Sequence, residues 1–546
     1  MMKKQCVAIL VLALLTVISA CAPAASPTPQ AAQPTGPAAS PTPQAAQPTV
    51  TQSASQVTPQ VTPTAPQRPK NLIVGHNIEP ATLDPFAHTT AAFQSVTAGA
   101  FEQLVMFAAN SSDVQPALAE SWSWSPDNRS LTFKLKKGVK FHNGEAFNAE
   151  AAKFSIEQLM ASKPFLVYTK DLNFKSADIV DENTVVMNLT QPIGTLLAVL
   201  ARGSFVVPPK YYKEVGPEGF SKSPIGTGPY QFVEWIKDNR IAFKSFPGYW
   251  GGAPKLATIT WQIIPDQTAR VAALKAGEVH FASSVVPGQA GQIKADSNLK
   301  LVSFPGLRQW ATFFDSRMDH PVANAKVRRA LNYAVDKQGL VALFEGNAAP
   351  LRGQFITPAV LGYNTGVDPF DYNPTKAKQL LSEAGYANGF EMIYKYTVGR
   401  YPLDKEMGEA VAGYLEAVGV KVKQTPLEFG EFSRQHSEPS MGPSWQWALL
   451  TPPDPHITLG LYSKGSKFNR FPDSPKVNDL LDRGMRETDQ TKRQAIYQEL
   501  VQHWNDDPIG IYLIVTNDLY AVRNEVIGFA PRVDQVIDLN QVDLAR

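Results

Sequence analysis

The chain of 546 residues is 44% hydrophobic and 18% charged, a composition that suits a folded protein with a sizeable core. Its 51 basic residues nearly balance its 49 acidic residues, so the charge does not indicate a nucleic-acid partner. Both cysteines, Cys6 and Cys21, lie near the N-terminus. The rest of the chain therefore offers no disulfide, no thiol nucleophile and no cysteine-based metal site.

The first 20 residues have the pattern of a secretory signal. Lys3 and Lys4 precede an apolar run over about Val7–Ile18, which is shorter than the roughly 20 residues of a membrane span. The run is followed by small residues, and the letters ISAC, which end on Cys21, resemble a bacterial lipobox. We expect residues 1–20 to be removed and Cys21 to carry lipid. The alternative is an ordinary signal peptide with a stray cysteine.

Residues 21–69 have the composition of a tether. The stretch Ala22–Gln67 contains no Asp, Glu, Lys or Arg, and "ASPTPQAAQPT" occurs in it twice. Such a segment cannot bury enough apolar surface to fold, and its prolines favour an extended chain. At about 3.1 Å per residue it would reach on the order of 150 Å. We therefore expect a disordered tether between a membrane and a folded body.

Strand and helix patterns begin near Lys70. Asn71–Val74 is a strand-like run, and period-two alternation predicts a hairpin over Trp122–Leu135, with a turn at the letters SPDN. Asn148 is expected to cap a helix that runs to about Met160. Further strand-like runs cover Ala257–Ile264, Gly389–Tyr396 and Ile509–Val515.

Three later helices are predicted from caps and apolar spacing. They cover about Asn324–Asp336, a segment that begins at Asn373, and about Asp404–Val418. Pro374 suits the first turn of the second helix, and Gly385 suits its C-terminal cap. The expected buried faces are Val327, Leu331, Ala334 and Val335 in the first helix and Ala377, Leu380, Leu381 and Ala384 in the second. Because strands and helices interleave, the predicted class is α/β with open sheets, in about three domains.

Motifs for catalysis, nucleotides and metals are not found. No two of the eight histidines are four residues apart, and there is no P-loop, nucleophile elbow or G-x-G-x-x-G. "GTGPY" at Gly226–Tyr230 lacks the lysine of a phosphate loop, and Pro229 removes a backbone donor, so we interpret it as a turn into the strand Gln231–Trp235. The sequence predicts no cofactor, no metal and no catalytic residue, although a dyad assembled from distant residues stays open.

Seven stretches of the folded part carry a recognisable pattern. In chain order they are "NLIVGHNIEPATLDP", the block Pro116–Leu159, "PIGTGPYQFVEW", "PGYWGGAPKL", "TARVAALKAGEV", "VRRALNYAVDK" and "YNPTKAKQLLSEAGY". Together they resemble the extracytoplasmic solute-binding proteins (family 5, peptide/nickel-type) of ABC transporters. The resemblance covers nearly everything from Asn71 to the end. It implies a class II, peptide-binding type of periplasmic-binding-protein fold: two α/β lobes joined by two hinge strands, with a small domain inserted in lobe one.

The resemblance also implies domain boundaries and a transport role. Lobe one would comprise 71–108, 208–303 and 517–546, the inserted domain 109–207, and lobe two 304–516. The hinges would fall near Leu301–Pro305 and Leu513–Asn517. Ligand would sit between the lobes, and closure would trap it for a permease driven by a separate ATPase. The protein would be a monomer held by lipid on the outer face of the bacterial cell membrane, in the periplasmic space.

The segment "SWQWALLTPPDPH" from Ser444 to His456 matches a ligand-binding stretch of the resembled family. There, a Trp-rich strand leads into an "Asp-Tyr-x-Asp-Pro"-like run whose first Asp pairs with the ligand's α-ammonium. Matching Asp454 to the second Asp puts Thr451 at the first. A threonine cannot supply a counter-charge, and an unpaired buried ammonium costs several kcal/mol, so peptides with a free amine are in doubt. A slip of the alignment would bring Leu449 or Leu450 there, which are not acidic either.

Other cleft candidates are weighed against structural roles. Trp445 and Trp447 share one strand face and would line the cleft or belong to the core. Arg308 would pair an anionic ligand group or be solvated. Asp454 would touch ligand or shape the loop. The remaining candidates for ligand contact are His456, Trp310, Asn469, His88 and Phe93.

We expect a binding protein and not an enzyme. The alternatives are a sensory or scaffold lipoprotein of the same fold and a secreted hydrolase with an unrecognised site. A short peptide is the favoured ligand. An oligosaccharide follows, because paired tryptophans suit sugar stacking, and a metal chelate held by His456 comes last.

Overall fold

The computed structural model describes residues 70–438, 441–466 and 468–545. The chain divides into Met1–Pro66 and Gln67–Arg546, and the structure describes only the second unit. The predicted signal peptide, Cys21 and the predicted tether lie outside the described residues. Among the residues that are described, no helix has the length and apolar character needed to cross a membrane.

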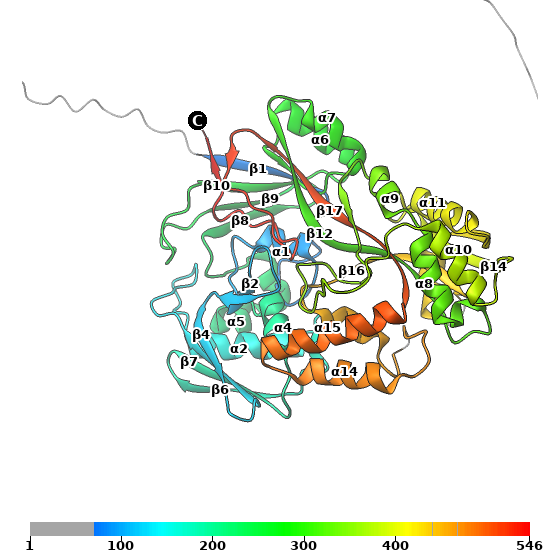
Figure 1. Cartoon of the computed structure of the whole chain (residues 1–546). Helices are drawn as coiled ribbons and strands as arrows, with labels where there is room; N and C mark the ends of the chain where they lie inside the picture. The colour runs from blue at the N-terminus through cyan, green and yellow to red at the C-terminus, as the bar shows by residue number, and fades with distance from the viewer. Residues whose placement is uncertain (1–69, 439–440, 467, 546) are drawn as a thin grey trace, which may run out of the picture. The chain divides into compact units, whose positions relative to one another are not determined.

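The centre of the folded unit is a mixed eleven-stranded sheet (Figure 1). Its strands, in spatial order, are β15 (Lys421–Glu428), β14 (Glu391–Val398), β16 (Ser444–Leu450), β12 (Leu299–Phe314), β17 (Gly510–Arg523), β11 (Phe281–Ala282), β1 (Asn71–His76), β10 (Thr258–Ile263), β9 (Arg240–Ser245) and β8 (Tyr230–Ile236), with β13 (Ala348–Pro350) also paired to β17. β1 is parallel to β10, and β14 is parallel to β15. A single helix connects β14 to β15, which is the usual connection between parallel strands. The α/β class is thereby confirmed.

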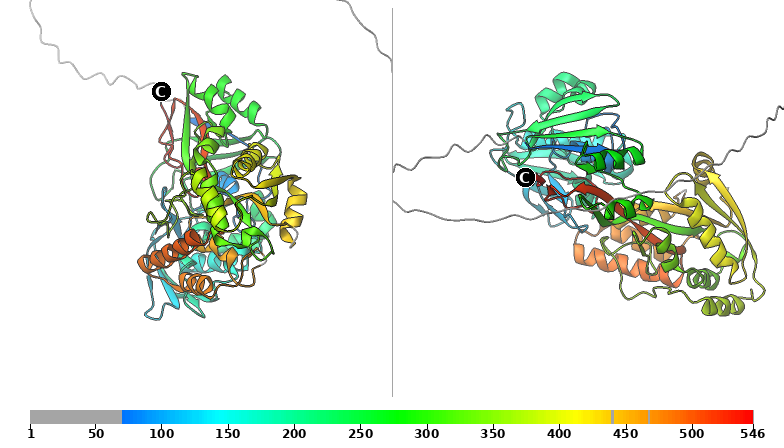
Figure 2. Two further views of the ribbon diagram at one scale, coloured as in Figure 1. Left: turned by 45° about the vertical axis from the view of Figure 1, so that its right-hand side comes forward. Right: turned by 90° about the horizontal axis from the view of Figure 1, so that it is seen from above.

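β12 and β17 run side by side through the sheet and serve both of its halves (Figures 1 and 2). On one side, Leu299–Phe304 pairs with Asp518–Arg523; on the other, Arg308–Phe313 pairs with Gly510–Thr516. The ladder is interrupted between Phe304 and Arg308, where Pro305 has no N–H to donate. The interruption adjoins the two predicted hinge segments, whose movement stays a prediction.

A second, separate sheet has four antiparallel strands. Its order is β4 (Ala119–Trp124), β5 (Ser130–Leu135), β7 (Thr184–Leu189) and β6 (Phe174–Asp181). The predicted hairpin over Trp122–Leu135 is β4 and β5, and Asn128 has a positive φ of 55° in its turn. This sheet lies within the segment expected to be an inserted domain, although the domain boundaries stay predictions. Two small ribbons pair β2 (Val105–Phe107) with β3 (Val114–Pro116) and β18 (Val526–Ile527) with β19 (Asp543–Leu544).

The four predicted helices are present, and three of them begin after a capping asparagine. Asn148 accepts hydrogen bonds from the N–H groups of Glu150 and Ala151 at the start of α2 (Ala149–Ala161). Asn373 accepts from Lys376 N–H at the start of α10 (Pro374–Glu383). The other two predicted helices are α8 (Ala325–Ala334) and α11 (Asp404–Glu416). Three of the four residues expected to be buried lie in α8, and the fourth, Val335, is buried just beyond its end.

The remaining helices cover the sheets and connect the strands. They are α1 (Ala91–Thr97), α3 (Leu166–Thr169), α4 (Leu196–Gly203), α5 (Pro209–Lys222), α6 (Gln267–Ala276), α7 (Ala290–Lys294), α9 (Lys337–Leu343), α12 (Phe429–Ser437), α13 (Pro455–Leu459), α14 (Pro475–Arg486) and α15 (Gln490–Asp506). "GTGPY" is a turn into β8, as expected. A side chain on Gly226 would lie 2.0 Å from the carbonyl oxygen of Ala100, so close backbone approach requires glycine there.

The buried apolar residues form two large clusters and a smaller one. One large cluster runs from Leu72 to Trp261 and takes in C-terminal residues as far as Leu544. The other lies between Leu307 and Val515, with Val533 added. The small cluster, which includes Leu274 and Leu519, packs beside the first half of β12. Each half of the large sheet thus has a core of its own, and β12 and β17 pass from one core to the other.

Candidate ligand-binding site

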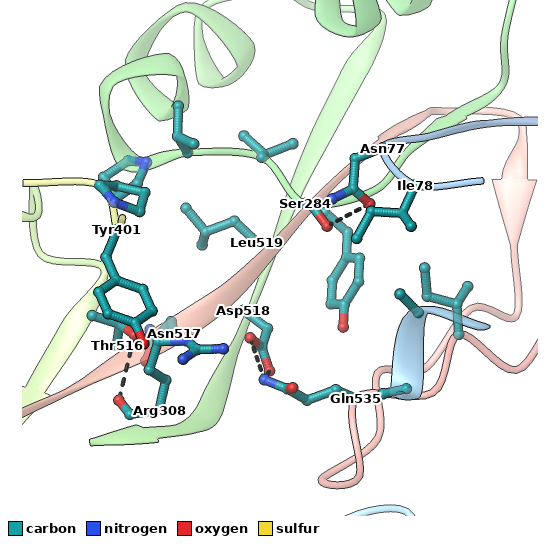
Figure 3. Close-up of a pocket in the computed structure, with 18 of the residues that line it drawn as sticks. Asn77, Ile78, Ser284, Arg308, Tyr401, Thr516, Asn517, Asp518, Leu519 and Gln535 are labelled. Atoms are coloured by element: carbon teal, nitrogen blue, oxygen red, sulfur yellow. Dashed lines mark hydrogen bonds between the residues drawn. The ribbon is translucent and has the colours of Figure 1, made fainter. Parts of the chain in front are cut away.

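A cavity of about 360 Å³ lies beside the interruption in the pairing of β12 with β17 (Figure 3). β12 contributes Arg308 and Trp310, and β17 contributes Thr516–Tyr520. The other walls come from His76–Ile78 at the end of β1, Ala91, Ala92 and Ser95 of α1, Ser284–Pro287, Phe344, Tyr401 and Pro402 before α11, and Gln535 and Ile537 near the C-terminus. The cavity therefore takes its walls from both halves of the large sheet.

Asp518 provides the acidic group of this cavity. The Gln535 side-chain amide donates to both of its carboxylate oxygens, at 2.8 and 2.9 Å. Burial raises the pKa of Asp518 to about 6, although the Gln535 hydrogen bond and the charge of Arg308 act in the opposite direction. The same burial, together with the nearby Asp518 charge, raises the pKa of Tyr520 well above its usual range. A carboxylate with a raised pKa in a cavity is a typical functional group.

Arg308 provides the basic group. Its guanidinium lies over the ring of Tyr401, 5.1 Å from the ring centre. Within the described part of the chain, this guanidinium has no hydrogen-bond or ion-pair partner. Trp310 is buried beside it, and its ring meets that of Tyr401 edge to face with centres 5.5 Å apart. Two of the predicted site residues, Arg308 and Trp310, thus line the cavity.

His76 forms part of the wall and is almost wholly buried, with 2% of its surface exposed. Its ring nitrogens contact the Ser283 hydroxyl at 2.9 Å and the Ala92 carbonyl oxygen at 3.2 Å. Burial lowers the pKa of His76 to about 4, so the imidazole is neutral at pH 7. It acts here as a hydrogen-bonding group that joins β1 to α1.

The two tryptophans of "SWQWALLTPPDPH" lie on β16, outside the cavity wall. Trp445 is buried and stacks on Phe313, with ring centres 6.1 Å apart. Trp447 packs edge to face on His436 at 4.4 Å, and its indole N–H lies 3.4 Å from the Tyr401 hydroxyl. Trp447 therefore contacts Tyr401, which lines the cavity, without lining the cavity itself. A ligand contact by either tryptophan stays a prediction.

Thr451 follows β16 directly and is fully buried. Its backbone N–H donates to the carbonyl oxygen of Leu307 at 2.9 Å, which places it beside the interruption of β12. Its hydroxyl has no hydrogen-bond partner among the described residues. No carboxylate stands at this position, as the sequence indicated.

Asp454 shapes the loop that follows. The Arg493 guanidinium donates to both of its carboxylate oxygens, and both side chains are 2% exposed. Asp454 also accepts from the His456 backbone N–H at 2.9 Å, which caps α13. The His456 ring lies against the Tyr497 hydroxyl at 3.1 Å, and burial lowers the pKa of His456 to about 4. Both side chains have local partners away from the cavity.

The other three candidates lie elsewhere. Asn469 lines a different cavity of about 310 Å³, in the half of the fold that contains α14 and α15. His88 and Phe93 pack ring against ring near α1, and burial lowers the pKa of His88 to about 3. The neighbouring Ala91 and Ala92, rather than these two rings, reach the cavity wall.

Sequence reasoning missed the acidic and amide groups of the cavity. Asp518, Gln535, Tyr401 and Ser284 were not among the candidates, although all of them line it. One signal was present: in "IYLIVTNDLYAV", three polar residues interrupt an otherwise apolar strand. Among the described residues, no group of three or more His, Asp or Glu side chains is arranged to hold a metal ion.

The chain resembles proteins of one family throughout its folded part. Residues 113–469 match the model of the bacterial extracellular solute-binding proteins, family 5 Middle. The dipeptide-binding protein of Escherichia coli K12 is 29% identical over 505 residues, which cover 86% of this chain and 94% of that protein. Glutathione-binding protein GsiB of Pectobacterium atrosepticum is 31% identical over 483 residues, which cover 85% and 92%. The solved structure of HbpA2 from Haemophilus parasuis has a TM-score of 0.80 at 25% identity, covering 87% of this chain and all of that one.

The fold and the match define a solute-binding protein. The chain belongs to family 5 of the bacterial extracellular solute-binding proteins. The resemblance noted in the sequence is thereby confirmed, as is the two-lobed α/β fold of the family. An inserted domain with the boundaries given above stays a prediction.

Proposed function

We propose that this chain is the solute-binding component of an ABC importer. It captures a peptide-like or other small polar ligand in the cavity beside the interruption of the β12–β17 pairing. The observation that carries the proposal is that this cavity takes its walls from both halves of a family 5 fold. Ligand sites of two-lobed proteins lie between the lobes. A peptide is the favoured ligand, because relatives named for dipeptide and glutathione binding match nearly their whole length.

Capture is proposed to occur by closure about the interruption of β12. Pro305 and Gly306 break the ladder there, so fewer backbone hydrogen bonds resist a change of angle between the halves. Closure would exclude water from the charged groups of the cavity and strengthen their contacts with ligand. The closed form would then be the form that a permease accepts.

The proposed location is the outer face of the cell membrane, with lipid on Cys21 and residues 21–69 as the tether. The lipobox-like letters and the charge-free composition support this part of the proposal. The family supports a place outside the cytoplasm. We propose that the chain acts as a monomer, binds no nucleic acid, uses no cofactor and performs no catalysis.

Mass spectrometry of the ligand that co-purifies with the full chain, followed by thermal-shift screening, tests the proposal. The screen would contain free-ended di- to pentapeptides, glutathione, oligosaccharides and nickel–histidine chelates. Stabilisation by peptides with micromolar affinity is expected, and incubation should return the peptide unchanged. Binding restricted to oligosaccharides or chelates would replace the ligand class, and turnover of the peptide would support a hydrolase.

A second experiment separates import from sensing. Deletion of the gene, with growth on the bound peptide as sole nitrogen source, should abolish uptake of radiolabelled peptide. Cys21→Ser should move the protein from the membrane fraction to the soluble fraction. Normal uptake in the deletion strain would instead favour a sensory or scaffold role.

A further inference from the structure

Two opposite charges line the cavity without pairing with each other. Asp518 is on β17 and Arg308 is on the neighbouring strand β12 (Figure 3). In the described part of the chain, no nitrogen of Arg308 lies within ion-pair distance of the Asp518 carboxylate. Opposite charges that share one partly buried cavity normally form an ion pair, because an unpaired buried charge is costly. Both groups are therefore available to a third molecule.

The interruption of the ladder keeps the two charges apart. Asp518 is opposite Phe304 on one side of it, and Arg308 is opposite Thr516 on the other. Gly306 lies between them, and a side chain there would stand 3.3 Å from the Asp518 carboxylate carbon. Glycine thus leaves space open beside the carboxylate. An unbroken pair of strands with an ordinary residue at 306 would fill that space.

Gln535 holds the Asp518 carboxylate in place. Its amide nitrogen donates to both oxygens, and its own backbone has a φ of +65°, which is uncommon for a residue other than glycine. Such backbone strain is concentrated at functional sites. The amide is neutral, so it orients the carboxylate without cancelling its charge. Burial raises the pKa of Asp518, and no cation among the described residues lies within ion-pair distance of its carboxylate.

Arg308 is prepared for an anion in a corresponding way. Its guanidinium rests on the face of Tyr401, which fixes the plane of the group and leaves its N–H donors unused by described residues. A planar guanidinium matches a carboxylate with two parallel hydrogen bonds. The cavity also exposes the apolar side chains of Ile78, Val285 and Leu519, which suit the uncharged part of a ligand.

We propose that Asp518 binds the cationic group of a zwitterionic ligand and that Arg308 binds its carboxylate. The inference rests on the proposed function and assigns the charge pattern of its ligand to two residues. It also explains how the protein could bind an ammonium group without an acid at position 451, because Asp518 on β17 would supply the counter-charge. Gln535 is the positioning residue of this site.

The test is isothermal titration of the full chain, in detergent, with three peptides: trialanine, N-acetyl-trialanine and trialanine amide. The wild-type protein should bind trialanine roughly 10- to 100-fold more tightly than either blocked form. Asp518→Asn should remove the preference over the N-acetyl form and keep the preference over the amide. Arg308→Gln should do the reverse. Glu278→Gln, which changes an exposed acid that does not line the cavity, should match the wild type.

Each outcome decides between the two proposals. An unchanged preference in Asp518→Asn, or an equal loss for all three peptides, overturns the site assignment while trialanine binding leaves the proposed function standing. Binding of none of the three by the wild type overturns the site assignment and the peptide ligand class of the proposed function. Thermal melting checks that the variants fold. If Asp518→Asn does not fold, Asp518→Thr and Gln535→Met replace it. Gln535→Met should lower the affinity for free trialanine more than the affinity for N-acetyl-trialanine.

Discussion

The Arg493 guanidinium donates two hydrogen bonds to the Asp454 carboxylate, at 2.5 and 2.9 Å, and both side chains are almost wholly buried. Arg493 also donates to the backbone carbonyl oxygen of Gly484 at 2.7 Å. The pair therefore joins the loop after β16 to α14 and α15. Its contribution is structural, because neither side chain lines the cavity beside the interruption of the β12–β17 pairing.

Asp454→Ala is expected to lower the free energy of unfolding by ~3–5 kcal/mol, because it leaves a buried guanidinium without a counter-charge. Urea denaturation of the full chain measures the change. The double variant Asp454→Leu with Arg493→Met should recover much of the loss, since it removes both charges. Asp473→Ala, which breaks an exposed pair with Lys464, is the matched control and should change little. A small loss in Asp454→Ala would contradict the buried pair.

Thr451→Val should keep or raise stability by about 1 kcal/mol, since it replaces a buried hydroxyl that has no partner among the described residues with a methyl group. Thermal and urea melts measure this. Peptide affinity should stay at the wild-type level, because the residue does not line the cavity. A loss of affinity in this variant would show that the threonine hydroxyl contacts ligand.

Gly306→Ala should destabilise the protein by ~1–3 kcal/mol, because its new methyl group would lie 2.4 Å from the carbonyl oxygen of Thr516 and push the strands apart. Gly291→Ala in α7 is the control, since nothing lies within 4 Å of a side chain there. Differential scanning calorimetry compares the two. Equal melting temperatures would mean that the strands do not approach as closely as described.

Binding of free-amine peptides should weaken by about tenfold per pH unit below pH 6, because the pKa of Asp518 is raised to about 6 and the protonated acid cannot attract an ammonium. The charged or titratable neighbours are Arg308, Tyr401, Tyr520 and His76, of which His76 stays neutral down to about pH 4. For stability the sign is opposite, because the native carboxyl holds its proton more firmly than an unfolded one. That contribution is present below pH 3.8 and is lost as the pH rises through 6. Titrations at pH 5, 6 and 7 with wild type and Asp518→Asn measure the slope, which the variant should lack.

Acid should destabilise the fold through His76. Its folded pKa of about 4 lies below the ordinary 6.5, so the unfolded chain binds a proton first as the pH falls. The contribution is complete above pH 6.5, and up to ~3 kcal/mol of it is lost by pH 4. Urea melts at pH 7, 5.5 and 4 should show a shallower pH dependence in His76→Gln. An identical dependence in the variant would contradict the neutral, buried imidazole.

Local structure could be predicted where a single residue decides it. Asn148 and Asn373 cap helices because their side chains reach backbone N–H groups two or three residues away, and the sequence shows that spacing directly. Alternation located the hairpin of β4 and β5 for the same reason. The strand predicted to end at Val515 instead continues to Arg523, since polar residues at 516–518 are tolerated where they face a cavity.

The site was harder to predict, because its groups meet through the fold. Asp518 and Gln535 are 17 residues apart, and the strand and loop that carry them come together only in the folded chain. Trp445 suggested a ligand wall from its residue type, yet it packs on Phe313 in a core. Composition cannot distinguish a buried tryptophan from one that lines a cleft, since both environments are largely apolar.

The position of β17 has a consequence for how the chain folds. β17 lies between β12 and β11, and it pairs with β12 residues about 200 positions earlier in the chain. Until the last strand has emerged, both halves have an open edge and an incomplete sheet. Long-range pairing of this kind forms slowly. Neither half can therefore complete its part of the large sheet until β17 has been synthesised.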